Sequence, residues 1–125
     1  MPLITIGDPT RSEVEMLVLI EAGQMAYPDV ENVARYFRAL TSDIIVVGKE
    51  ENRFTIEGMV TLMELDGSRL YEDSNSLEER MKLYQSIIEE HERTPDGTIL
   101  ISNSGLDLTA AILMNMDFVW GFDVS

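Results

Sequence analysis

The stretch DIIVVG, residues 43–48, constrains the fold more than any other part of the sequence. Four β-branched apolar residues in a row, bounded by Asp43 and Gly48, are typical of a strand that is covered on both faces. A strand of this kind lies inside a sheet that carries helices on both sides. The sequence therefore predicts a domain in which strands and helices are interspersed.

Hydrophobic periodicity and turn residues predict the other elements. The expected strands are residues 2–6, 43–48, 53–62, 68–71, 98–102 and 117–125, and the expected helices are 11–25, 28–40, 77–91 and 108–116. These segments predict one domain over residues 1–125, of the α/β or α+β class. We expect a mixed β-sheet of about five strands packed with three to four helices, in the order β-α-α-β-β-β-α-β-α-β.

Two of these assignments depend on whether the apolar residues are read at helical spacing or as the alternation of a strand. A capping box, Thr10 with Glu13, and apolar residues at helical spacing favour a helix over 11–25. Residues 53–62 alternate between apolar and polar side chains, which favours a half-buried strand with a bulge at Gly58. The pair Asp66-Gly67 then predicts a hairpin that returns through residues 68–71.

The strongest compositional signal is charge. The chain has 23 acidic and 9 basic residues, which gives a formal net charge of −14. Such a surface repels nucleic acid and anionic membranes, and it speeds encounter with a cationic partner. Solubility alone is the alternative explanation. Neither a targeting segment nor an apolar run long enough to span a membrane is visible, so we expect a soluble, cytoplasmic protein.

The inventory of reactive groups is small. Cysteine is absent, so disulfides, thiolate metal sites and cysteine nucleophiles are excluded. The single histidine, His91, is expected at a helix C-terminus, where its protonated form is favoured. The stretch YEDSNSLEER lacks the glycine and glutamate that a calcium-binding EF-hand loop needs. We therefore predict no catalytic residues, no metal site and no cofactor, and we do not expect an enzyme of a common class.

The N-terminus suggests one exception. The stretch PLITI, followed by Arg11-Ser12 and a predicted helix, resembles the start of the 4-oxalocrotonate tautomerase family. The resemblance implies that Pro2, once Met1 is removed, would act as a base whose pKa an apolar pocket lowers. The helix break at Tyr27-Pro28 departs from the family's plan. We predict that Pro2 is the first residue of a strand.

The segment SNSGLD, residues 102–107, is the candidate ligand loop. It follows an apolar strand and precedes a helix, which is where open α/β sheets bind ligands. Small residues there let backbone N–H groups reach an anion. The predicted ligand-binding residues are Ser102, Asn103, Ser104 and Gly105, although Asp107 would oppose a phosphate.

The leading hypothesis is a small acidic binding protein that contacts a positively charged protein partner. An immunity protein or antitoxin, an anti-restriction or anti-CRISPR inhibitor, and a secretion chaperone all act in this way. The predicted partner-binding residues are Tyr71, Glu72, Asp73, Glu78 and Glu79. Three alternatives remain: a homo-oligomeric small-molecule sensor or enzyme that uses the Ser102–Asp107 loop, a structural subunit without chemistry, and the tautomerase-like enzyme.

Overall fold

A six-stranded sheet runs through the computed structural model, which describes residues 4–6, 16–25, 27–39, 43–65, 67–71 and 76–120. The strand order is β1-β6-β5-β2-β3-β4. The strands are β1 (Ile4–Ile6), β2 (Leu17–Glu21), β3 (Ile44–Lys49), β4 (Gly67–Tyr71), β5 (Thr98–Ser102) and β6 (Asp117–Trp120). β2 to β6 are all parallel, and the three-residue β1 pairs antiparallel with β6 at one edge.

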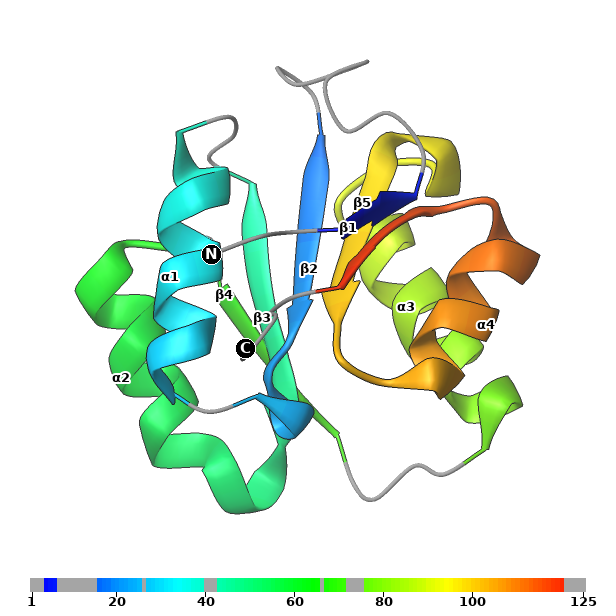
Figure 1. Cartoon of the computed structure of the whole chain (residues 1–125). Helices are drawn as coiled ribbons and strands as arrows, with labels where there is room; N and C mark the ends of the chain where they lie inside the picture. The colour runs from blue at the N-terminus through cyan, green and yellow to red at the C-terminus, as the bar shows by residue number, and fades with distance from the viewer. Residues whose placement is uncertain are drawn as a thin grey trace.

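Four helices cover the two faces of this sheet (Figure 1). α1 (Tyr27–Arg38) and α2 (Arg53–Met63) lie on one face, and α3 (Leu77–Glu90) and α4 (Gly105–Met114) lie on the other. Each helix connects two parallel strands, as parallel pairing requires. Short 3-10 turns, η1 (Ala22–Gln24), η2 (Glu50–Asn52) and η3 (Pro95–Gly97), complete the described elements. The chain is therefore a single α/β domain with helices on both faces.

The prediction from DIIVVG is confirmed. β3 pairs with β2 on one side and with β4 on the other, and its residues Ile44 to Val47 are buried. Ile44 and Val46 face α1 and α2, whereas Ile45 and Val47 face α3 and α4. Burial of both faces explains why the run is apolar throughout rather than alternating.

The helix predicted over residues 11–25 is wrong for the part that the structure describes. Residues 17–21 form β2, which is completely buried between β3 and β5. The run LVLIE satisfies helical spacing only because every position is apolar or buried, so its period carries no information. Residues 7–15, which include Arg11 and the expected capping box, lie outside the described residues.

The strand predicted over residues 53–62 and the hairpin after it are also wrong. Residues 53–63 form α2, and β4 then pairs with β3 in parallel. The expected mixed sheet is therefore corrected to a parallel one, in which antiparallel pairing is limited to β1 at the edge. Asp66 itself lies outside the described residues.

The remaining predicted segments agree with the structure where it describes them. They are the described part of the first strand, which forms β1, and α1, β4, α3, β5, α4 and the part of the last strand that forms β6. Phe118 and Trp120 pack edge to face on one side of β6, and Val119 packs on the other side, as the alternation predicts. Pro2 lies outside the described residues. Within the described ranges, no helix has the length and apolar character needed to cross a bilayer.

Candidate functional site

The carboxyl edge of the sheet contains a topological switch point between β2 and β5. The chain moves from β2 outward through β3 to β4, and α3 then brings it back to β5 on the other side of β2. The connections after β2 and β5 therefore leave toward opposite faces of the sheet. Ligands of open α/β sheets bind in the crevice at this point.

Polar side chains from five elements meet below this edge, and we call them the carboxyl-edge cluster. All are buried: Glu21 at the end of β2, Tyr71 at the end of β4, Arg80 and Tyr84 on α3, Ser102 at the end of β5, and Asp107 on α4. Buried polar groups require hydrogen-bond partners, so the arrangement of these six side chains is mutually dependent.

Asp107 is the hub of the cluster. Its carboxylate accepts hydrogen bonds from the Ser102 hydroxyl at 2.7 Å and from the Tyr84 hydroxyl at 2.8 Å. Arg80 Nη1 lies 3.4 Å away and supplies the compensating positive charge. The Ser104 N–H donates to Ser102 Oγ at 3.1 Å, which fixes the start of the predicted ligand loop. The Asp107 carboxylate therefore holds β5, α3 and α4 together from inside.

Glu21 differs from the other members of the cluster in its hydrogen bonding, because only one of its two carboxyl oxygens has a partner among the described residues. Its Oε1 accepts hydrogen bonds from the Tyr71 hydroxyl and from the Gly23 N–H at 2.9 Å. Its Oε2 is buried and has no hydrogen-bond partner among the described residues. Burial raises the pKa of Glu21, although the bond from Tyr71 opposes the rise. A Cβ at position 23 would lie 2.6 Å from Oε1, so only glycine fits beside this carboxyl group.

Arg80 connects the two carboxyl groups. Its guanidinium lies over the Tyr71 ring, 4.6 Å from the centroid, and its Nη1 is 3.9 Å from Glu21 Oε1. Burial raises the pKa of Tyr71 and of Tyr84, and nearby carboxylates add to both rises, so both phenols stay protonated and act as donors. The inward side of α3 is thus fixed by charge and hydrogen bonds as well as by apolar contact.

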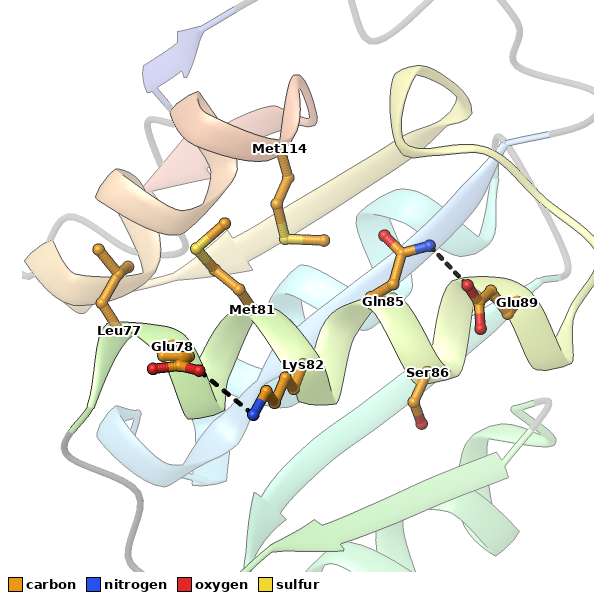
Figure 2. A pocket seen from close by; sticks show the side chains of 8 residues that line it. All are labelled: Leu77, Glu78, Met81, Lys82, Gln85, Ser86, Glu89 and Met114. Carbon is orange, nitrogen blue, oxygen red and sulfur yellow. Dashed lines mark hydrogen bonds and ion pairs between the residues drawn. The ribbon is translucent and has the colours of Figure 1, made fainter.

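The outward side of α3 borders an open groove beside α4, which we call the α3/α4 groove. Its volume is about 550 Å³, and it is lined by Leu77, Glu78, Met81, Lys82, Gln85, Ser86, Glu89 and Met114. Met81 and Met114 reach into the space between the two helices (Figure 2). Glu78 pairs with Lys82 at 3.3 Å, and Gln85 donates to Glu89 at 3.0 Å along the exposed rim.

The structure separates the predicted site residues. Ser102 and Tyr71 both belong to the carboxyl-edge cluster and are buried. Asn103 and Ser104 are half-buried just before α4, and Gly105 is exposed at its first residue. Glu78 and Glu79 are exposed in the first turn of α3. The predicted ligand-binding and partner-binding roles stay predictions, and Glu72 and Asp73 lie outside the described residues.

Sequence reasoning did not identify Glu21, Arg80 and Tyr84. Glu21 does carry a signal, because it is the only charged residue in the buried run LVLIE at the end of a strand. Arg80 and Tyr84 are four residues apart on α3, which places both on one helix face. Within the described ranges, no group of three or more metal-ligating side chains could hold a metal ion.

Comparisons of the chain with protein-family models, with curated proteins and with solved structures find no match.

Proposed function

We propose that the protein binds a positively charged segment of a partner protein in the α3/α4 groove. The observation that supports this proposal is an apolar, methionine-lined groove whose rim carries carboxylates, on a chain with a net charge of −14. The immunity-protein or antitoxin, anti-restriction or anti-CRISPR and chaperone roles considered above all depend on carboxylates that attract a basic partner.

The floor of the groove suits apolar anchor side chains. Leu77, Met81 and Met114 provide it, and methionine adapts its shape to different partners because its side chain is unbranched and polarisable. A volume of about 550 Å³ has room for a few apolar side chains. An amphipathic helix with anchors three or four residues apart fits such a groove.

The charged residues on the rim of the groove favour a positively charged partner. Glu78 and Glu89 line the groove, with Lys82 as the one cation among its lining residues. Lys82 is already paired with Glu78, and both side chains are about three-quarters exposed, so the pair is weak and exchangeable. A lysine or arginine of the partner can replace Lys82 at Glu78 while the overall negative field speeds encounter.

The carboxyl-edge cluster prepares this groove for binding. Arg80 and Tyr84 bind Asp107 of α4 from the inward side of α3, so the spacing of the two helices is set before a partner arrives. A preformed groove loses less entropy on binding than one that must assemble.

A fluorescent amphipathic helical peptide, with leucine anchors on one face and lysines beside them, provides the test. We expect Met81→Lys to weaken binding about tenfold or more, and Glu78→Lys to weaken it about threefold. Glu51→Lys makes the same charge change on exposed η2, on the other side of the molecule, and is the matched control. Equal loss in Glu78→Lys and Glu51→Lys would show that the peptide senses only net charge and would contradict the proposal.

A second candidate function is favoured by Glu21. Its Oε2 is buried at the switch point and has no hydrogen-bond partner within the part of the chain that the structure describes. This supports a site for a small ligand with hydroxyl or amino donors, rather than for an anion, which Asp107 would repel. Adenosine, which carries both kinds of donor, is a suitable probe. We expect it to shift the amide NMR signals of Gly23 and Ser104 in the native chain, and unchanged signals at millimolar adenosine would count against this candidate.

A further inference from the structure

We propose that two copies of the chain associate through the outward face of α2, with the two helices antiparallel and Gly58 at the two-fold axis. This outward face consists of Phe54, Thr55, Gly58, Thr61 and Leu62, and we call it the α2 face. It lies on the opposite side of the sheet from the α3/α4 groove (Figure 1).

The α2 face exposes large apolar side chains without a partner in the described residues. Phe54 is 88 % exposed and Leu62 is 63 % exposed, whereas Ile56 and Met59 on the inward face are buried. Phe54 has the largest exposed fraction among the exposed large apolar residues of the described chain. Side chains of this size, gathered on one helix face, are typical of an interface.

Gly58 lacks an explanation within one copy of the chain. Glycine weakens the interior of a helix, and a Cβ at this position would meet no atom within 4 Å. Gly48 shows the contrast, because a Cβ there would lie 2.0 Å from Ile56 Cδ1. The missing side chain at position 58 therefore serves contact with something outside the chain, where it lets another helix approach closely.

The residues around Gly58 are arranged symmetrically. Phe54 and Leu62 lie four residues before and after it, and Thr55 and Thr61 lie three residues before and after it. An antiparallel pair centred on Gly58 therefore sets Phe54 against Leu62 of the second copy, and Thr55 against Thr61. Each contact then occurs twice, as a two-fold symmetric interface requires. This symmetry favours a second copy of the chain over an unrelated partner.

The distribution of charge also favours a second copy of the chain at the α2 face. No residue of the α2 face is charged, and two copies with a net charge of −14 can approach closely only through such a surface. At the N-terminal end of α2, Arg53 pairs with Glu50 and Glu57. At its C-terminal end, Arg35 pairs with Glu31, and Glu64 lines the same hollow of about 370 Å³ as Arg38. The charges at both ends are thus already paired or mixed within one copy, and the uncharged centre around Gly58 is the part that two copies can bring together.

Sedimentation velocity of the full chain over a range of concentrations tests this proposal. We expect a monomer–dimer equilibrium whose dissociation constant rises about tenfold or more in Phe54→Glu and in Gly58→Leu. Leucine is a good helix former, so Gly58→Leu blocks close approach without weakening α2. Ile112→Glu is the matched control, because Ile112 is 60 % exposed on α4, and it should leave the dissociation constant unchanged.

Circular dichroism and thermal melting of each variant show that it is folded before its association is compared. A native chain that stays monomeric at millimolar concentration would overturn the proposal. So would a dimer that persists in both α2 variants, or one that Ile112→Glu disrupts to the same degree. A monomer that instead loses a different protein partner in Phe54→Glu would show that the α2 face serves another chain.

Discussion

The α3/α4 groove and the α2 face lie on opposite sides of one sheet and differ most in their charge. The groove has an apolar floor with carboxylates on its rim, whereas the α2 face has no charged residue at all. Both expose apolar side chains, so hydrophobicity alone does not distinguish them. Their charged groups do: carboxylates lie on the rim of the groove, whereas the α2 face itself has no charge and is bordered by the ion pair of Arg53 with Glu57.

The supports of the two surfaces differ as well. α3 is held by Arg80 and Tyr84, which bond to buried Asp107. α2 is held by Ile56 and Met59, which are apolar, and Ile56 occupies the space left open by Gly48. Polar support fixes direction as well as distance, and apolar packing fixes mainly distance. The position of α3, which lines the groove, is thus more strictly defined than the position of α2.

This difference shows how a strongly acidic chain can carry two surfaces of different charge. The net charge of −14 describes the whole molecule and does not say where carboxylates are absent. An exposed apolar patch without charge is the informative feature on such a surface. The following changes should affect the two surfaces unequally.

The largest expected effect comes from Asp107→Ala. This change removes one of the anions beside buried Arg80 and removes acceptors from Ser102 and Tyr84. We expect the free energy of unfolding to fall by about 3–5 kcal/mol, measured by urea denaturation. Exposed Glu51→Ala should change it by less than about 0.5 kcal/mol. A loss below about 1 kcal/mol would mean that the cluster does not support the groove.

Salt should move the two surfaces in opposite directions. Raising the ionic strength from low to high screens the attraction between the rim and a basic peptide, so the peptide dissociation constant should rise about tenfold. The same salt screens repulsion between two copies, so the dimer dissociation constant should fall several-fold. Peptide anisotropy and sedimentation in matched buffers measure both. If the two constants move together, the contrast between the surfaces is wrong.

The parts of the fold that the sequence predicts correctly are those with one clear period or with turn residues at both ends. β3 and β5 are short apolar runs between turn residues, and α3 begins at Ser76, whose hydroxyl accepts from the Glu79 N–H as its capping box predicts. β2 is different: like β3 it is buried on both faces and has no period to read, but no Gly, Pro, Asn or Asp occurs in the seven residues before it. Composition alone cannot separate such a strand from a buried helix.

The error over α2 has a more specific cause. Phe54, Ile56, Val60 and Leu62 alternate in the sequence, and alternation favours a strand. In the structure only Ile56 and Val60 of these four pack inward, while Phe54 and Leu62 are exposed. The two residues that misled the prediction are therefore the two that later support the proposed dimer. A period that breaks because apolar residues face outward is itself a signal of an interface.

The carboxyl-edge cluster could be predicted only in part for a topological reason. Ser102 and Asp107 are five residues apart, and a single loop prediction covered both. Glu21 reaches Tyr71 across 50 residues, and Tyr84 reaches Asp107 across 23. Such pairs depend on the strand order, and the incorrect assignment of β2 as a helix concealed that order.

A smaller effect is expected from Gly58→Ala, which separates the stability of the monomer from the affinity of two copies for each other. In the monomer, alanine should raise the free energy of unfolding by about 0.5–1 kcal/mol, since it strengthens the helix and meets open space. In the dimer, two added methyl groups at the axis should weaken association. Urea denaturation at low concentration and sedimentation at high concentration measure the two changes. An alanine that stabilises both would contradict close approach at Gly58.

The smallest expected effect is on how the free energy of unfolding depends on pH. It concerns only the carboxyl-edge cluster, which contains Glu21. Burial raises the pKa of folded Glu21 above the unfolded value of 4.5, so the folded chain holds this proton more tightly than the unfolded chain. The contribution of Glu21 to stability therefore declines as the pH rises from about 4.5 through the folded pKa. Glu21→Gln cannot titrate, so its unfolding free energy should fall less over that interval.

Glu79→Gln removes an exposed carboxyl group of α3 and measures what a surface acid contributes to the same slope. Hydrogen exchange adds the spatial contrast: at rising pH, after correction for the intrinsic exchange rate, amides of α3 near Arg80 should lose protection before those of α2 near Met59. Equal slopes in the native chain and Glu21→Gln would mean that Glu21 is ionised in the fold. Its unpartnered oxygen would then have a cationic or donor partner that the described residues do not supply.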